Sequence, residues 1–342
     1  MTALLRAPLL RADDLVRGFP GRRSLVDTIR GRPAPVVRAL AGVSIAVHRG
    51  ETLAIVGESG CGKSTLGRAL VRLVDLESGQ IDFDGQDVRT LRGPALRAYN
   101  RRVQMIFQDP YSSLNPRMTV GETLAEALHV HRIVARADIP ARVAMLLDLV
   151  RLPSTAVDRL PNAFSGGQRQ RIAIARALSV EPDLLVADEI VSALDVSVQA
   201  QVLNLLLDMQ ERLGLAMIFV SHDLRVVRHL AHHVAVMYLG RVVEHGPADA
   251  VFEHPQHPYT QALLRAAPTL EPGATRTRQA ALQGELPSPM HQLPGCPFHP
   301  RCPAAFAPCA SVVPRTTIRD GHSVTCHLHD AGDAVAQQPH CP

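Results

Sequence analysis

The amino-acid sequence predicts an α/β fold in which a parallel sheet carries a nucleotide-binding site at one edge. One observation is a glycine-rich segment, residues 57–64, which matches the phosphate-binding loop pattern G-x-x-x-x-G-K-[ST]. Another is a series of short apolar runs that each stop at a polar side chain. Because ligands of open parallel sheets bind outside the carboxyl ends of the strands, we expect these polar residues to form one site.

The phosphate-binding loop lies between a predicted strand and a predicted helix. Residues 52–56 form an apolar run typical of a buried strand, and Leu66, Leu70 and Leu73 recur at helical spacing after the loop. Lys63 is the only lysine in the 342-residue chain. Its compact ammonium group fits between two phosphates better than the planar fork of arginine. The residues predicted to bind the nucleotide are Gly57, Ser59, Gly60, Cys61, Gly62, Lys63, Ser64 and Thr65.

Three further apolar runs lead to polar residues. The runs are residues 103–107, 184–187 and 216–220, and the polar residues after them are Gln108, Asp188, Glu189, Ser221 and His222. Each has an ordinary interpretation when it is taken alone: Gln108 suits a turn, and His222 suits the edge of a core. Together with the phosphate-binding loop, they predict one site for nucleotide, metal ion and water.

The residue types in this site indicate phosphoryl-transfer chemistry. Asp188 is the carboxylate expected to bind Mg²⁺, which bridges phosphates and neutralises their charge. Ser64 and Gln108 are expected to complete the protein ligands of that ion. Glu189 lies where a carboxylate can orient the attacking water, although a solvated acid without function suits the same position. Glu189 and His222 are therefore the predicted catalytic residues, His222 by contact with the terminal phosphate.

A second phosphate-binding segment is predicted at Ser165, Gly166, Gly167 and Gln168, just before a helical pattern over residues 169–178. Exposed amides and the helix dipole favour an anion at a helix N-terminus. An ordinary N-cap, with glycines that only shape the turn, explains the same residues equally well.

The order of these segments resembles the nucleotide-binding subunit of an ABC transporter. The resemblance covers residues 10–250 and includes Ser192–Asp195 between Glu189 and His222. It implies a RecA-like core with an antiparallel β-subdomain and a helical subdomain. It also implies a head-to-tail dimer, in which Ser165–Gln168 of one subunit closes on ATP at the phosphate-binding loop of the other. Asp195 would then lie in the loop between the two sites.

Other segments are similar to the oligopeptide and dipeptide importer branch of that family. These segments are residues 57–68, 109–116, 191–201 and 257–259. Residues 19–36 resemble the second of the two ATPase types in such importers. The similarity implies a heterodimer with a related ATPase, two membrane permease subunits and an extracytoplasmic substrate-binding protein, and it implies a place on the cytoplasmic face of the cell membrane. Nickel or another small solute is an alternative cargo.

The chain is expected to divide into an ABC ATP-binding domain over residues 1–255 and an importer-type C-terminal extension over residues 256–342. Within the first part, we expect an antiparallel β-subdomain over residues 10–50 and a helical subdomain over about residues 112–165. Phe19, before Pro20, is the aromatic residue best placed to stack on adenine, and hydrophobic packing at a turn explains it equally well. Residues 268–295 are rich in proline, glycine and threonine and are typical of a linker.

The C-terminal extension carries four cysteines in the spacing C-x5-C-x6-C-x16-C, which are Cys296, Cys302, Cys309 and Cys326. Four thiolates suit either structural zinc or a [4Fe–4S] cluster. His299, His322 and His327 lie nearby in the sequence, so a mixed site of cysteine and histidine is open as well. The importer branch favours the [4Fe–4S] cluster. Because the chain contains no C-x2-C pair, four thiols without a ligand are the alternative.

Composition argues against several other classes of protein. The formal net charge is +4, and acids and arginines are interspersed, so no basic block indicates nucleic-acid binding. No apolar run reaches the roughly 18 residues of a membrane span, and the N-terminus lacks the apolar region of a signal peptide. We therefore expect a cytosolic or peripheral protein. A soluble ABC ATPase outside transport is the remaining rival, but the two ATPase domains or long coiled-coil insertion typical of that class are absent from the sequence.

Overall fold

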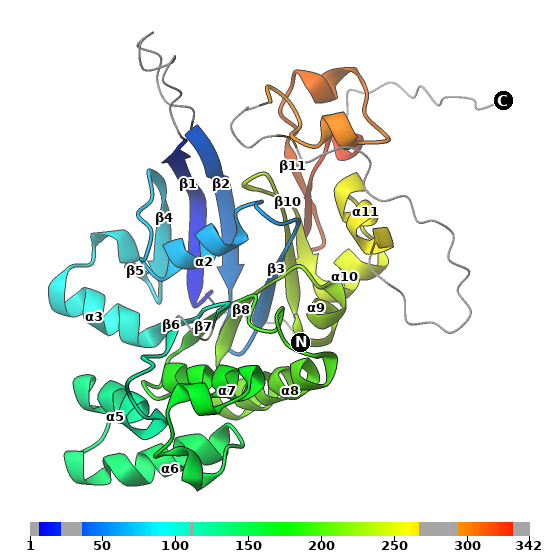
Figure 1. Cartoon of the computed structure of the whole chain (residues 1–342). Helices are drawn as coiled ribbons and strands as arrows, with labels where there is room; N and C mark the ends of the chain where they lie inside the picture. Colours follow the sequence, from blue (N-terminus) through cyan, green and yellow to red (C-terminus); the bar gives the residue numbers. More distant parts are fainter. Residues whose placement is uncertain (1–6, 22–35, 110–112, 267–286, 288–292, 331–342) are drawn as a thin grey trace, which may run out of the picture.

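The computed structural model describes residues 7–21, 36–109, 113–266, 287 and 293–330, and the statements below concern those residues. Two sheets form its framework (Figure 1), one of four strands in the order β2-β1-β4-β5 and one of eight in the order β11-β12-β10-β9-β3-β8-β7-β6. The strands are β1 (Leu10–Pro20), β2 (Val36–Val47), β3 (Thr52–Val56), β4 (Ser78–Phe83), β5 (Gln86–Asp87), β6 (Val103–Ile106), β7 (Leu184–Asp188), β8 (Ala216–Ser221), β9 (His233–Tyr238), β10 (Arg241–Pro247), β11 (Thr316–Arg319) and β12 (His322–Thr325).

The parallel half of the large sheet confirms the α/β prediction. Strand β3 pairs in parallel with β8 and β9, and β7 pairs in parallel with β6 and β8. Every residue of β3, β7 and β8 is buried. Strands covered on both faces read as continuous apolar runs, which is why these segments were recognisable in the sequence.

Helices cover the large sheet and extend away from it. They are α2 (Lys63–Leu70), α3 (Gly93–Arg102), α5 (Val120–Val130), α6 (Ile139–Leu149), α7 (Gly166–Leu178), α8 (Val196–Leu213), α9 (Leu224–Leu230), α10 (Ala248–Glu253) and α11 (Pro258–Ala266). Helices α5 and α6 lie in the region where the helical subdomain was expected, at the lower end of the molecule in Figure 1. Helix α2 packs in one core with both sheets, because Leu66 and Leu70 share a buried cluster with Leu40 and Ile55.

The four-stranded sheet is antiparallel, as expected, but it draws on more of the chain than residues 10–50. Strands β4 and β5 follow the phosphate-binding loop in sequence and return to pair with β1 and with each other. The turn between them contains Asp84 at φ 55° and Gly85 at φ 80°. An Asp-Gly pair with positive φ at both residues is typical of a tight hairpin turn.

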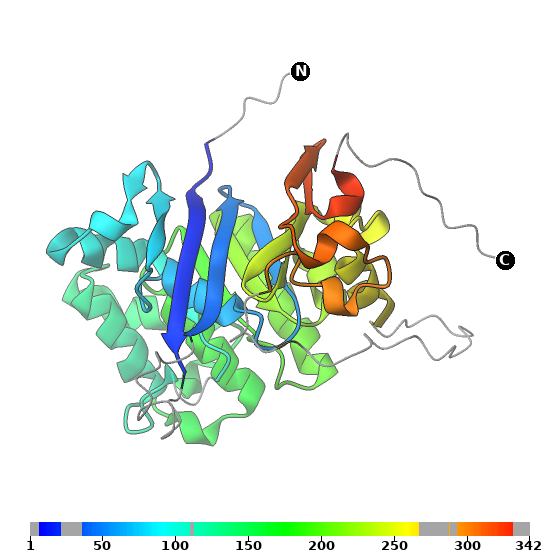
Figure 2. The same ribbon diagram turned by 90° about the horizontal axis from the view of Figure 1, so that it is seen from above.

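The C-terminal segment adds strands to the large sheet. In the β11-β12 hairpin, β12 pairs antiparallel with β10 through Glu244 and Val324 and through His245 and Ser323. Figure 2 shows this segment, in orange and red, beside the yellow-green part of the sheet and opposite the blue and cyan strands. The sheet thus joins two parts of the chain that the expected boundary at residues 255 and 256 separates. Most of the expected linker, residues 268–295, lies outside the described residues.

No helix among the described residues is both long enough and apolar enough to cross a membrane.

Candidate nucleotide-binding site

The phosphate-binding loop connects β3 to α2 and needs glycine where it turns. Gly62 has φ 108°, and a Cβ atom there would lie 2.1 Å from the backbone oxygen of Ala39. Gly57 has φ 151°, and its Cβ would lie 2.2 Å from the backbone oxygen of Met237. Only glycine fits both positions, because a backbone oxygen cannot move aside as a flexible side chain can.

Lys63 folds back over the loop. Its ammonium group donates hydrogen bonds to the backbone oxygens of Gly57 at 2.8 Å and Glu58 at 3.0 Å. The same nitrogen lies 3.8 Å from Oε1 of Glu189, and the Lys63 side chain is only 4% exposed. A buried ammonium needs such partners because burial without them is costly. The loop therefore keeps a positive charge ready at the position where a phosphate is expected.

Ser64 and Asp188 are in direct contact across the site. The Ser64 hydroxyl donates a hydrogen bond of 2.9 Å to Oδ1 of Asp188, at the end of β7. Asp188 is 2% exposed. Burial raises the pKa of its carboxyl group, and the Ser64 hydrogen bond opposes that change. Carboxylate and hydroxyl oxygens are donors that suit Mg²⁺, and a divalent cation would offset the cost of the buried charge.

Glu189 lies at the centre of the polar residues that follow the strands. Its Oε2 accepts a hydrogen bond of 3.3 Å from the Gln108 amide, and it lies 3.4 Å from Nδ1 of His222. Its backbone has φ 48°, a left-handed conformation that is unusual for glutamate. The Glu189 N–H donates to the oxygen of Val220, and the Ser192 hydroxyl donates to the oxygen of Glu189. These bonds fix the strained residue, as is common at functional sites.

The structure thus brings together most of the residues predicted for the site. The residues linked by direct contacts are Lys63, Ser64, Gln108, Asp188, Glu189 and His222. Ser59 and Gly60 are exposed in the loop, and Thr65 is half-buried in the first turn of α2. Cys61 is different, because its side chain lies in the hydrophobic core, where burial raises the pKa of its thiol.

The Ser165–Gln168 segment forms a capping box at the start of α7. The Gln168 N–H donates to Oγ of Ser165 at 3.4 Å, and the Ser165 N–H donates to Oε1 of Gln168 at 3.0 Å. Both side chains are exposed. Gly167 lies against α8, where a Cβ atom would be 2.2 Å from Cγ1 of Val198. Ser165 is therefore the N-cap of α7, and because the cap is exposed, it is also accessible to an anion from outside.

Asp195 and Phe19 are the remaining residues predicted for the site. Asp195 is exposed at the N-cap of α8 and makes no side-chain capping bond. Phe19 lies near the end of β1 opposite Val37 and is half-buried. The Arg17 guanidinium lies 4.8 Å from the centre of its ring, so a cation already covers one face of Phe19.

The four cysteines of the extension line one small cavity, together with His257, His299 and His327. All four are free thiols. Burial is the main cause that raises the thiol pKa values of Cys296, Cys302 and Cys326, the last to about 11. Among the described residues, no three His, Cys, Asp or Glu side chains are arranged to hold a metal ion. The cavity gathers the predicted ligands without placing them in a metal-binding geometry.

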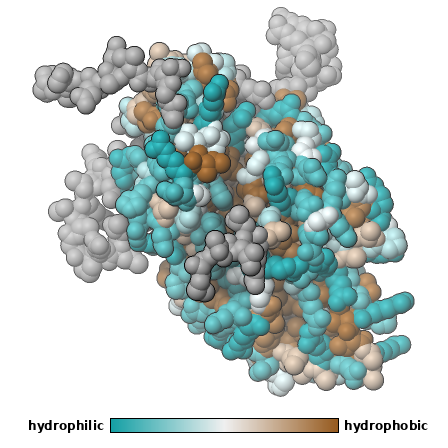
Figure 3. Space-filling view, turned by 180° about the vertical axis from the view of Figure 1, so that it is seen from behind, coloured by the Kyte–Doolittle hydropathy of each residue, from teal (hydrophilic) through white to brown (hydrophobic). Residues whose placement is uncertain are grey.

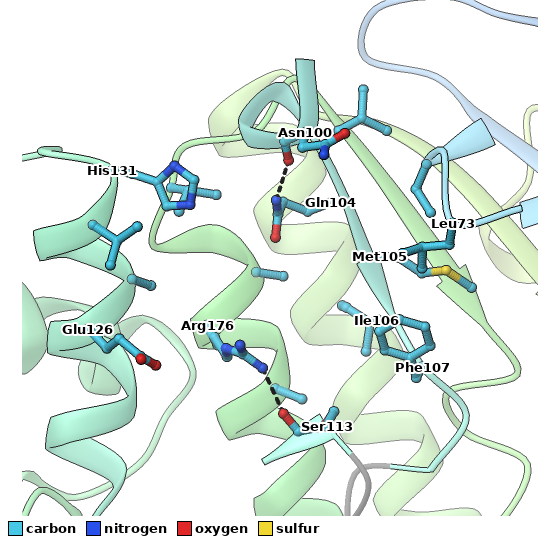
Figure 4. A pocket seen from close by; sticks show the side chains of 17 residues that line it. Leu73, Asn100, Gln104, Met105, Ile106, Phe107, Ser113, Glu126, His131 and Arg176 are labelled. Atoms are coloured by element: carbon cyan, nitrogen blue, oxygen red, sulfur yellow. Dashed lines mark hydrogen bonds between the residues drawn. The ribbon is translucent and has the colours of Figure 1, made fainter. Parts of the chain in front are cut away.

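A groove of about 450 Å³ lies between β6 and the helices α5 and α7, and sequence reasoning did not identify its lining. Figure 4 shows Glu126, His131 and Arg176 on one side of it and Met105 and Phe107 on the other. Val130 on its rim is 65% exposed, and Met145 on the neighbouring helix α6 is 60% exposed. In Figure 3, seen from behind, apolar side chains also gather at the lower, helical end of the molecule.

Sequence reasoning also missed the contacts that the extension makes with the phosphate-binding loop. Arg301 forms two hydrogen bonds with Glu58, and the Glu58 N–H donates to the hydroxyl of Tyr259 at 2.9 Å. The Tyr238, Tyr259 and Phe298 rings pack together beneath these contacts, with centroids 4.7 to 5.4 Å apart. Nothing in the local pattern around Arg301 points to a residue 243 positions away.

Comparisons with known proteins find similar families and relatives. The ABC transporter family matches residues 40–192, and the family of the oligopeptide/dipeptide transporter C-terminal region matches residues 243–309. The chain is 49% identical to a probable peptide ABC transporter ATP-binding protein of Sinorhizobium fredii, over 97% of this chain and 93% of the relative. It is 47% identical to the dipeptide transport ATP-binding protein DppF of Escherichia coli, over 96% of each chain.

Solved structures share the fold. The ATP-binding cassette MJ0796, solved as a dimer in a post-hydrolysis state with ADP and phosphate, is similar at a TM-score of 0.61 and 25% identity, over 70% of this chain and 98% of that one. The CbiO1 protein of Clostridium perfringens, part of an ABC transporter complex, is similar at a TM-score of 0.61 and 28% identity, over 72% of this chain and 91% of that one.

Proposed function

The chain belongs to the ATP-binding proteins of ABC transporters, in the oligopeptide/dipeptide importer branch, and we propose that it hydrolyses ATP to drive the import of di- and oligopeptides. The main support for ATP hydrolysis is a contact network at the carboxyl ends of β3 and β7, formed by Lys63, Ser64, Asp188 and Glu189. Such a network combines a fixed cation, a metal-binding carboxylate and a second carboxylate, as ATP hydrolysis requires.

Binding of ATP begins at the phosphate-binding loop. Lys63 exchanges its two backbone oxygen partners for phosphate oxygens, and the N–H groups at the start of α2 face the same phosphates. Ser64, Asp188 and Gln108 are the residues that would bind Mg²⁺, which supplies charge neutralisation to the phosphates when bound. Phe19 is the proposed contact for the adenine ring, on the face that Arg17 leaves open.

Hydrolysis then depends on Glu189 and His222. The Glu189 side chain is 17% exposed, so a water molecule can reach its carboxylate from the open side. Contacts with other residues of the chain hold the carboxylate in place. Its carboxylate accepts a hydrogen bond from that water and orients it toward the terminal phosphate. His222, which is mostly exposed and next to Glu189, contacts the same phosphate.

A second subunit completes the site. Ser165, Gly166, Gly167 and Gln168 are proposed to contact ATP bound to the partner, and Asp195 to lie between the two sites. The exposure of Ser165, Gln168 and Asp195 supports this assignment, because the side chains are accessible to another subunit. By the importer resemblance, that subunit is a related ATPase and not a second copy of this chain.

The groove between β6 and α5 is the proposed contact with one of the two permease subunits. Its rim combines exposed apolar side chains, such as Val130, with the charged groups Glu126 and Arg176. A short amphipathic helix fits such a surface, since its apolar face fills the groove and its ends meet the charges. The chain would thereby lie at the cytoplasmic face of the membrane, with the substrate-binding protein on the opposite side.

The cysteine cavity is a separate, subordinate proposal. Its four thiols suit a [4Fe–4S] cluster or zinc by number and type, but their present arrangement does not form a metal site. Occupation would require the thiols to lose protons and turn toward one another. Anaerobic purification followed by analysis for iron, sulfide and zinc tests this proposal. About one equivalent of zinc, or about four of iron, supports a site, and a protein that contains neither metal contradicts it.

The function is tested by recovery of the intact assembly. The chain would be tagged in its native host, and membranes would be extracted with mild detergent. Two membrane subunits, a second ATPase and a peptide-binding protein in the purified complex support the proposal. A substrate-binding protein that binds nickel and no peptide would change the cargo, and ribosomes or DNA-repair proteins in place of membrane subunits would contradict transport.

A further inference from the structure

Glu58, the second residue of the phosphate-binding loop, is held from two sides by residues that follow the ATP-binding core in sequence. Its carboxylate contacts Arg301, and its backbone N–H contacts Tyr259. Its own backbone oxygen accepts hydrogen bonds from the Lys63 ammonium at 3.0 Å and from the Cys61 N–H at 3.3 Å. Every polar group of Glu58 therefore has a defined partner.

The contact with Arg301 is a two-point ion pair. Nη1 donates to Oε2 of Glu58 at 2.7 Å, and Nη2 donates to Oε1 at 3.0 Å. The Arg301 side chain is 5% exposed and that of Glu58 is 25% exposed. The pair raises the pKa of Arg301 above its ordinary value. Parallel hydrogen bonds of this kind restrict both the distance and the orientation of the carboxylate.

Tyr259 fixes the backbone of the same residue. It is fully buried at the start of α11, and its hydroxyl accepts the Glu58 N–H at 2.9 Å. Burial keeps the pKa of this hydroxyl above its ordinary value, so it remains protonated. Its ring packs against Tyr238 and Phe298, which limits how far the hydroxyl can move.

The charge of Glu58 matters because the loop has to admit a triphosphate. A carboxylate inside a phosphate-binding loop repels the phosphates, and the repulsion is strong where water is partly excluded. Arg301 neutralises that carboxylate and turns it toward the extension, while Tyr259 fixes the loop backbone. Without Arg301, the Glu58 carboxylate would lose its ion-pair partner and leave a negative charge on the loop.

We propose that Arg301 and Tyr259 are positioning residues for ATP binding, which act through Glu58 and make the C-terminal extension part of the nucleotide site. This inference rests on the proposed ATP-binding role of the loop. It gives a role to the attachment of the extension to the sheet beside β10, since Tyr259 of α11 and Arg301 of the turn at residues 299–301 both contact the loop.

The test is the Kd for ATP with Mg²⁺, measured by titration calorimetry on the full-length chain. Arg301→Met should raise Kd by about 10- to 100-fold, because Glu58 then keeps its charge without a partner. Glu58→Gln combined with Arg301→Met should return Kd to within about threefold of the unmodified chain. Tyr259→Phe should raise Kd by about three- to tenfold, through loss of one hydrogen bond.

The control is Arg142→Met, which breaks a more exposed ion pair with a single contact to Glu181, at 2.6 Å, and should leave Kd unchanged. Thermal unfolding of each variant monitors the fold. If Arg301→Met does not fold, Arg301→Lys, which keeps the charge but not the fork, should raise Kd by a smaller factor.

The outcomes separate this inference from the proposed function. If the unmodified chain does not bind ATP, the proposed function fails and the inference fails with it. If the unmodified chain binds ATP and Arg301→Met binds it equally well, only the inference fails. It also fails if the double variant binds as poorly as Arg301→Met, because Arg301 would then act only through the fold of the extension.

Discussion

The two phosphate-binding segments of this chain differ in how far the chain itself completes them. In the loop around Lys63, the lysine itself is buried, and polar groups of the loop contact other residues of the same chain, including Glu189 and the extension. The segment around Ser165 is exposed and bonds mainly within its own first turn. The difference indicates that the first segment is preorganised in the single chain, whereas the second is available to another subunit.

The largest effect that tests this comparison is expected at Glu189. Glu189→Gln keeps the hydrogen bonds of the side chain but removes the charge that orients water. We expect ATP turnover by the assembled complex to fall by about 100- to 1,000-fold, with ATP binding retained. Single-turnover measurements with labelled ATP, beside equilibrium binding, check both parts. Normal turnover in this variant would remove Glu189 from the catalytic role.

A second test replaces the cationic side chain of the phosphate-binding loop. Lys63→Arg keeps a positive charge, but the planar fork does not fit among the Gly57 and Glu58 oxygens that now surround the ammonium. We expect the Kd for ATP to rise by about 100-fold. Calorimetry on the isolated chain measures it. An unchanged Kd would show that only the charge matters at this position.

A third test addresses the exposed segment. Aspartate and asparagine both replace serine well as N-caps, so neither should unfold α7. Ser165→Asp, however, places a negative charge where the partner's ATP is expected, and turnover of the complex should fall by about 10- to 100-fold. The matched variant Ser165→Asn should fall much less. Both should bind ATP normally as isolated chains, and a weakened Kd there would contradict the division of roles.

The smallest expected effect concerns the buried histidine beside the loop contacts. Burial lowers the pKa of His257 from an ordinary 6.5 to about 3, while its Nδ1 accepts the Tyr259 N–H at 3.0 Å. Between pH 6.5 and 3 the unfolded chain binds a proton that the folded chain does not, so the free energy of unfolding falls as the pH falls through this window. Above pH 6.5 this group has no effect.

For that histidine, acidification from pH 7 to pH 5 should cost about 2 kcal/mol of stability. Denaturant unfolding at a series of pH values measures the loss. His257→Asn keeps an acceptor for the Tyr259 N–H but does not titrate, so its stability should depend less on pH. Equal slopes for the two chains would assign the acid sensitivity to other groups, such as His245, whose pKa burial lowers to about 4.

The site was largely predictable because its residues follow local rules. Lys63 and Ser64 belong to a fixed motif, and Asp188, Glu189 and His222 come directly after apolar runs that form parallel strands. The geometry of such sheets then brings these residues together without any further information. The signal for β4 and β5 was present too, in the Asp84-Gly85 turn, but their alternating polar residues do not form an apolar run.

The contacts of the extension could not be predicted in the same way. Glu58 and Arg301 are 243 positions apart, and neither periodicity nor spacing relates them. Their meeting depends on how α11 and the β11-β12 hairpin attach to the large sheet, which is a property of tertiary packing. The cysteines illustrate the converse case, since their sequence pattern suggested a metal site and the structure gathers them around one cavity without a metal-binding arrangement.

The most direct test of the account is peptide uptake by the purified complex in liposomes. The complex would contain either the unmodified chain or Glu189→Gln, together with its substrate-binding protein and ATP on the cytoplasmic side. The account predicts ATP-dependent accumulation of a labelled dipeptide with the unmodified chain and almost none with Glu189→Gln. Equal accumulation by both complexes, or accumulation without ATP, would contradict it.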